Sequence, residues 1–396
     1  MAGRRAQALA IGTAQIIAWG SSTYLPASIA APMAAGLGLE TSAIFAAYSG
    51  ALGLMAVLGP AIGRLIDGHR GRAVLCASNL ILAAGLVLLA VAPTAWAMVA
   101  GWTVIGVGMA CGLYDAAFAT LVREQGTAAR PSITGVTLLG GFASTLAWPV
   151  TAWLVSAWNW PTACLAWAAA HLCLALPLNY FAIQPAAAKT PPSGGEAHRP
   201  AARGAHPAKR RNFLLLAVFG AATAFVASAM SAHLPLLLGA LGLAPAAAIA
   251  AAALFGPAQV MARLAEFLAA TRLRTGALAT ARWATFLFPA GAGTLLAVGG
   301  SPLAASLFVL LHGAGNGLIT IAKGVLPLAL FGPQGYGVLQ GRLAVVQRGM
   351  QAIAPLSFAL VLERGGAATA LAMTLAVASL AWVALMLIRR PGEENG

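Results

Sequence analysis

The chain has 396 residues, of which 60% are hydrophobic and only 8% are charged. Soluble domains carry ~25% charged residues, so this composition excludes a soluble globule and predicts an integral membrane protein in contact with the lipid bilayer. The formal net charge of +14 comes from basic residues between apolar stretches, which favours topology signals and argues against nucleic-acid binding.

Apolar runs bounded by Pro, Gly or charge clusters predict an all-α integral membrane fold with twelve transmembrane helices. Cytoplasmic segments would then hold sixteen of the 23 Lys and Arg residues, and the outer loops only Arg364. We therefore expect both termini in the cytoplasm and a multi-pass protein of the bacterial inner membrane. The predicted spans are residues 7–33, 42–66, 73–93, 95–122, 131–157, 160–183, 212–240, 245–270, 275–298, 301–330, 335–362 and 366–388.

The first span is too long for a secretion signal and is expected to be retained. It carries Gln15 and Ser22 close to Gly20 and Pro26. This pattern predicts a locally broken helix whose polar groups line a substrate cavity. Polar side chains that only pack between helices are an equal alternative.

The turn between spans 2 and 3 contains a carboxylate among arginines. Its notable residues are Gly63, Asp67, Arg70 and Arg72. Asp67 can accept hydrogen bonds from an arginine and from the positive end of a neighbouring helix, which predicts a gate on the cytoplasmic side. The alternative is a solvated, positive-inside turn without a gating role.

Asp115 is the one acidic residue well inside a predicted span. It lies about eight residues from the inner end of span 4, or ~12 Å. A buried carboxylate is costly unless it is paired, hydrated or protonated, so Asp115 is the candidate proton carrier, with a static salt bridge as the alternative. Lys323 lies at a corresponding depth in span 10, and we assign both residues to proton coupling, leaving open whether they pair.

Residues 184–211 form the one long polar stretch and are rich in Pro, Gly and basic residues. They predict a flexible cytoplasmic linker between an N-terminal six-helix half, residues 1–183, and a C-terminal six-helix half, residues 212–390. Residues 391–396 would form a cytoplasmic tail. Gly59-Pro60-Ala61 in span 2 recurs as Gly256-Pro257-Ala258 in span 8, which supports two pseudo-symmetric halves.

Span 8 ends with Arg263 and Glu266, three residues apart. Residues at this spacing share a helix face, so we expect them to pair with each other and to close the cytoplasmic side together with Asp67.

Span 11 carries a polar stripe that includes Gln347, Arg348 and Gln351, and Asn316 is a similar polar residue in span 10. Such groups should face protein or water, and we assign all four to the substrate cavity. Arg348 is near mid-span and could hold a carboxylate or phosphate. A structural arginine that bonds helix-end carbonyls is the alternative.

The run from Gly63 to Arg72 resembles the loop signature of the major facilitator superfamily. Gly68 and Arg70 stand where that family has a basic residue and a glycine, so the arginine that partners Asp67 stays open. Residues 112–118 and 315–324 resemble a bacterial branch of the family, whereas span 5 has only a degenerate form of the drug-antiporter signature. The resemblance implies alternating access by the rocking of two halves.

These features predict a secondary transporter of a small organic solute. They argue against an enzyme, because no converging catalytic set exists in or near the spans. Proton coupling is expected, and export is favoured by family analogy. Uptake of a small organic anion, an uncoupled facilitator and metalloid efflux through intramembrane cysteines are the alternatives. No cofactor or metal is expected, since the cysteines lack metal-type spacing, and we expect a monomer.

Overall fold

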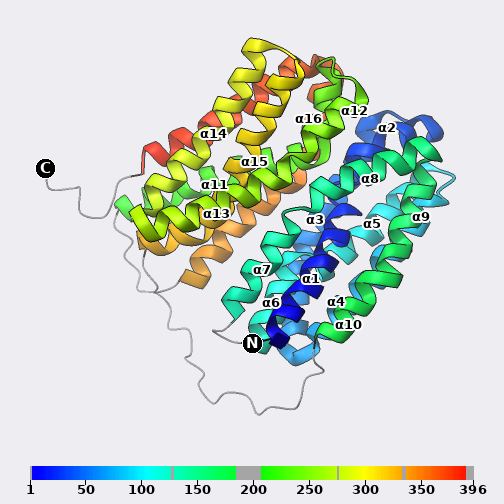
Figure 1. Ribbon diagram of the computed structural model, residues 1–396, viewed down its shortest axis with the longest axis horizontal. Coiled ribbons are helices and arrows are strands. Elements are labelled where there is room, and N and C mark those ends of the chain that lie inside the picture. The colour runs from blue at the N-terminus through cyan, green and yellow to red at the C-terminus, as the bar shows by residue number, and fades with distance from the viewer. Residues whose placement is uncertain (1, 126–128, 184–206, 274–275, 332–335, 389–396) are drawn as a thin grey trace, which may run out of the picture.

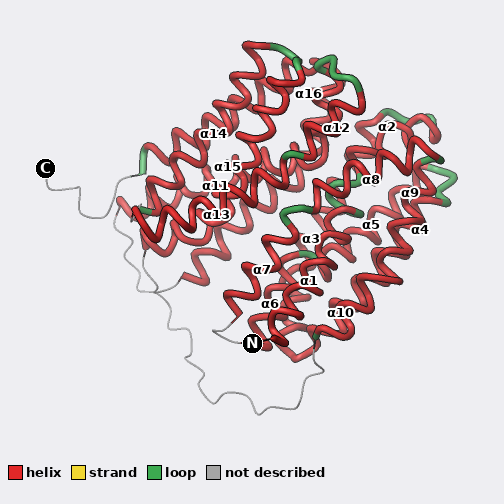
Figure 2. Tube along the Cα trace, in the orientation of Figure 1, coloured by secondary structure: helices red, strands yellow, loops and turns green. Residues whose placement is uncertain are grey.

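The computed structural model describes residues 2–125, 129–183, 207–273, 276–331 and 336–388. Throughout these ranges the regular structure is helical, which confirms the all-α prediction (Figure 2). Helices are the expected solution because a lipid-embedded backbone must satisfy its hydrogen bonds within the segment. Most of the predicted linker and the whole predicted tail lie outside the described residues.

The first six predicted spans are built from ten α-helices and two short π-helical segments, η1 and η3. Spans 1, 4, 5 and 6 are each divided into shorter helices. The bounds are α1 Ala2–Gly20, α2 Pro26–Leu37, α3 Thr41–Leu65, η1 Ile66–Arg70, α4 Gly71–Ala90, α5 Ala95–Gly112, α6 Tyr114–Gln125, α7 Arg130–Gly140, α8 Ala143–Ala157, α9 Trp160–Ala170, η3 His171–Ala175 and α10 Leu176–Ala182.

The last six predicted spans correspond to α11 through α16. Span 8 is divided at Leu254, and α16 combines spans 11 and 12 across a non-helical Gly366 with φ of +77°. The bounds are α11 Pro207–Ala240, α12 Pro245–Ala253, α13 Phe255–Leu273, α14 Ala277–Val298, α15 Pro302–Phe331 and α16 Tyr336–Met386.

Among the described residues, nine helical stretches are long and apolar enough to cross a membrane by length and composition. One of them, 342–386, contains predicted spans 11 and 12 together. Predicted spans 1 and 9 are also helical but do not belong to the nine. The protein is thus a multi-pass membrane protein.

The helices pack as two groups, α1 to α10 and α11 to α16 (Figure 1). The principal contacts between the groups join α3 to α16, α8 to α12 and α13, and α2 to α11. We call the end of the bundle where α1 begins the N-terminal end, and the opposite end, where α3 begins, the distal end. The two groups are called the first and the second half below.

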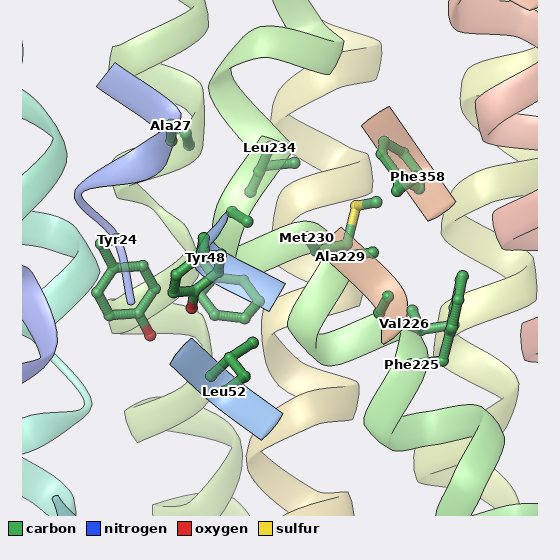
Figure 3. Close-up of a cluster of buried hydrophobic side chains, with 14 of the residues drawn as sticks. Tyr24, Ala27, Tyr48, Leu52, Phe225, Val226, Ala229, Met230, Leu234 and Phe358 are labelled. Atoms are coloured by element: carbon green, nitrogen blue, oxygen red, sulfur yellow. The ribbon is translucent and has the colours of Figure 1, made fainter. Parts of the chain in front are cut away.

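The halves are held together towards the distal end. Tyr48 and Leu52 of α3 belong to the same buried apolar cluster as Met230 of α11 and Phe358 of α16 (Figure 3). Burying apolar side chains from both halves in one cluster stabilises this contact.

Polar contacts reinforce the distal packing. The Ser42 amide donates to Glu363 Oε1 at 2.6 Å, and the Phe45 ring stacks on His233 with ring centroids 3.8 Å apart. At the N-terminal end, by contrast, described contacts such as that of Gln7 with Glu124 remain within one half. From the contacts at the distal end we infer a state that is closed there and parted at the N-terminal end.

Candidate substrate and coupling site

Span 4 is broken in the middle, which the sequence analysis did not predict. Leu113 between α5 and α6 has extended backbone, with φ of −79° and ψ of −174°. The break frees the Gly112 carbonyl, which accepts a hydrogen bond from Gln15 Nε2 at 2.7 Å. Gln15 also accepts from Trp19 Nε1 at 3.2 Å. Gln15 is buried, and from the neighbouring helix it supplies the hydrogen bond that the Gly112 carbonyl lacks at the break.

Asp115 lies in the first turn of α6, directly after this break, where the positive end of the helix dipole favours a carboxylate. Its Oδ2 atom forms an ion pair with Nη2 of Arg348 on α16, at 2.6 Å. The Asp115 side chain is 75% exposed and that of Arg348 30% exposed. The pair thus joins the two halves, and protein covers little of its carboxylate.

Arg348 also lies close to the backbone of α3. A Cβ atom added to Gly59 would be 2.9 Å from Arg348 Nη1, so the guanidinium packs directly against this glycine. The sequence analysis left open whether Asp115 pairs with Lys323. In the structure, the ion-pair partner of Asp115 is Arg348. Lys323 on α15 is half-buried and has an interaction of its own.

Arg263 on α13 is the second arginine at the boundary between the halves. Its Nη1 donates to the Thr137 carbonyl of α7 at 3.0 Å and its Nε to the Gly317 carbonyl of α15 at 3.3 Å. Its Nη2 is 3.4 Å from Gln259 Oε1, which also accepts from Asn316 Nδ2 at 3.0 Å. Asn316 thus belongs to an arginine-centred hydrogen-bond network.

The ion pairs expected at the gate are not formed between these described residues. Arg263 is engaged with the oxygens above and forms no ion pair with Glu266, which follows it on α13. Asp67 is exposed and forms none with Arg70 or Arg72.

Arg72 instead makes a cation–π contact with Tyr180. Its guanidinium carbon lies 3.8 Å from the centre of the Tyr180 ring. At Gly63 an added Cβ would meet open space. Because the halves are parted at this end, a gate that joins them would be open in this state.

The other predicted cavity residues do not converge on one point. Ser22 is fully buried and donates to the Ala18 carbonyl of its own span at 2.5 Å. Gln347 packs against Gly220 of α11, where an added Cβ would be 2.7 Å from its Nε2. These two side chains make contacts within their own halves.

Gln351 contacts a neighbouring helix through its backbone carbonyl, because Pro355 follows it by four residues. Proline has no N–H, so the Gln351 carbonyl lacks its helical partner and instead accepts from Ser228 Oγ at 2.8 Å. The adjacent Leu356 amide donates across the boundary to Ser49 Oγ of α3 at 3.1 Å.

The same chemistry occurs between α8 and α13. Pro257 leaves the Ala253 carbonyl without a helical donor, and Thr145 Oγ1 of the first half donates to it at 3.0 Å. The backbones approach closely here, since a Cβ added to Gly256 would be 2.6 Å from the Gly141 carbonyl oxygen. A proline in an interface helix, with a hydroxyl residue opposite, is the sequence signal that could have revealed both contacts.

A two-part helical bundle with broken helices and an ion pair between its parts has the architecture of a membrane transporter. The profile of the Major Facilitator Superfamily matches residues 11–355, and the chain belongs to this family. No curated protein matches the chain.

Solved structures show the same fold. A bacterial homolog of the human lysosomal transporter Spinster, in an inward-facing and unoccupied conformation, has a TM-score of 0.70, with 14% identity and 98% of each chain covered. A mutant of the nucleoside transporter NupG has a TM-score of 0.73 at 16% identity, covering 98% of this chain and 100% of that one. A mutant of the peptide transporter POT has a TM-score of 0.74 at 12% identity, covering 96% and 93%.

Proposed function

We propose that this protein is a proton-coupled secondary transporter of a small organic solute, and that Asp115 and Arg348 form its proton-sensitive contact. The ion pair between the halves carries the proposal. Protonation would remove the charge that holds Arg348, which weakens the contact and frees the guanidinium. Because Asp115 is 75% exposed, protons can reach it from the parted end.

The expected topology makes this state inward-facing, with the N-terminal end in the cytoplasm of a bacterial cell. The likeness to the inward-facing Spinster homolog supports this assignment. Export remains the favoured direction by family analogy, with uptake of an organic anion as the alternative.

Flux through proteoliposomes tests the function as a whole. Growth of a deletion strain across toxic compounds and carbon sources would first identify a transported compound. An imposed pH gradient should then drive its accumulation, whereas an uncoupled facilitator would only equilibrate it. Absence of any protein-dependent flux of that compound would contradict a transport function.

The topology has its own test. A fluorescent protein fused after Arg390 should fluoresce, and alkaline phosphatase fused at the same point should be inactive, because the basic residues favour a cytoplasmic carboxyl terminus. Active phosphatase would contradict the twelve-span topology and with it the inward-facing assignment.

The gate proposal concerns Asp67, which we expect to bond an arginine and a helix end once the N-terminal ends of the halves meet. Asp67→Ala should reduce the rate of transport without reducing the amount of protein in the membrane. Arg64→Ala, in the last turn of α3 and three residues before Asp67, serves as a control for a general loss of charge. Transport at the wild-type rate in Asp67→Ala would show that the turn only sets topology.

A further inference from the structure

Among the described residues, Arg263 lies at the boundary between the halves without forming an ion pair to a carboxylate. Arg348 is paired with Asp115, and Arg282 donates to the Leu385, Met386 and Ile388 carbonyls at the end of α16, where the helix dipole is negative. Within the part of the chain that the structure describes, Arg263 donates to two backbone carbonyls and the Gln259 amide oxygen. The Thr137 carbonyl lies in the last turn of α7, and a helix end supplies at most about half a negative charge.

The guanidinium also retains donors. An arginine has about five N–H groups, and the three hydrogen bonds of Arg263 leave two of them for another acceptor. The side chain is half-buried, so these donors are neither fully hydrated nor sealed from the parted end. A partly desolvated cation with spare donors favours an anionic ligand.

Residues of both halves surround Arg263. It lies within electrostatic range of Tyr24 and Tyr114 of the first half, and Tyr114 begins α6 at the break in span 4. The Tyr114 ring is 5.0 Å from that of Trp19 and 5.0 Å from that of Phe118, centroid to centroid. Tyr114 therefore connects an aromatic cluster at the break with the surroundings of Arg263.

The balance of charged side chains near the break in span 4 indicates which charge a ligand of Arg263 should carry. Asp115, next to Tyr114, is matched by Arg348, and the positive charge of Arg263 is left over. One negative charge restores neutrality, which favours a monoanion over a phosphate dianion. A carboxylate accepts from two neighbouring guanidinium N–H groups at once.

We propose that Arg263 binds the carboxylate of an organic monoanion whose body lies against the aromatic side chains at the break in span 4. That this anion is the transported solute rests on the proposed function. That Arg263 binds it does not, because binding can be measured on the resting protein without any flux.

Binding to the purified protein in detergent tests the proposal with matched pairs of probes. Benzoate, phenylacetate and lactate are compared with benzamide, phenylacetamide and lactamide, using calorimetry and the total fluorescence of the ten tryptophans, to which Trp19 contributes. At least one carboxylate should bind more tightly than its amide, because the amide keeps the shape and loses the charge. Arg263→Gln should weaken that binding roughly ten- to a hundredfold, and Arg263→Lys by less.

Arg282→Gln is the matched control, since Arg282 is also an arginine of the second half with three oxygen acceptors. It should bind the carboxylate as the wild type does. Equal binding of all three carboxylates and their amides, tighter binding of inorganic phosphate, or unchanged affinity in a folded Arg263→Gln protein would each overturn the proposal. Carboxylate binding together with flux that ignores the pH gradient would instead contradict only the proton coupling.

Discussion

Asp115→Asn is expected to abolish accumulation driven by a pH gradient while downhill exchange of the solute continues. Asparagine keeps the size and can still accept a hydrogen bond from Arg348, but it cannot lose and regain a proton. The ion pair across the halves is 2.6 Å long in the wild type, so the variant changes its charge with little change in shape. Accumulation and exchange are measured in the same proteoliposomes.

Glu124→Gln is the matched control, because Glu124 lies on the same helix and bonds Gln7 within the first half. It should keep proton-driven accumulation. Accumulation at the wild-type level in Asp115→Asn would exclude Asp115 as the carrier. Thermal stability of Arg348→Gln, Asp115→Asn and the double variant measures the coupling energy of the ion pair, and additive effects would mean that the pair contributes none.

A disulfide between cysteines at positions 49 and 356 is expected to stop nearly all transport, and reduction should restore it. Ser49 Oγ accepts from the Leu356 amide at 3.1 Å across the boundary, so these positions are adjacent when the distal end is closed. Ser49→Cys with Leu356→Cys is made in a background without the four native cysteines, which are Cys76, Cys111, Cys164 and Cys173. A covalent bond there would hold the distal end shut.

The single variants Ser49→Cys and Leu356→Cys, treated with the same oxidant, cannot form the bond and should keep transporting, which controls for oxidation. Mass spectrometry establishes the extent of the cross-link. Full transport with the 49–356 bond formed would mean that the distal ends need not part, and would contradict alternating access.

The apolar runs predicted the helices well because lipid leaves a chain few other structures. Each predicted span is helical in its described residues, and the break in span 1 falls between Gly20 and Pro26, where glycine and proline indicated it. The break at Leu113 was missed because a single extended residue in an apolar run leaves little trace in the sequence. Only Gln15, a polar residue on a neighbouring span, offered a hint of its partner at Gly112.

Pairings between helices were harder to predict than the helices. Depth along a span can be counted, but each residue turns the side chain by about 100°, so depth alone did not distinguish Lys323 from Arg348 as the partner of Asp115. Spacing within one helix suggested Arg263 with Glu266, whereas packing brings the Thr137 carbonyl of the other half to Arg263. Such contacts depend on how the halves meet, which a single sequence does not specify.

The hydroxyl groups opposite the two interface prolines give the protein a means of setting its resting equilibrium. Ser49 and Thr145 bond backbone atoms of the other half, so their contribution is present only while the distal ends touch. A bond of this kind contributes about 1 kcal/mol, which corresponds to roughly a fivefold change in the ratio of the two orientations. Substitutions of Ser49 or Thr145 would therefore change the ratio of the inward-facing and outward-facing orientations, without altering the Asp115–Arg348 ion pair or Arg263.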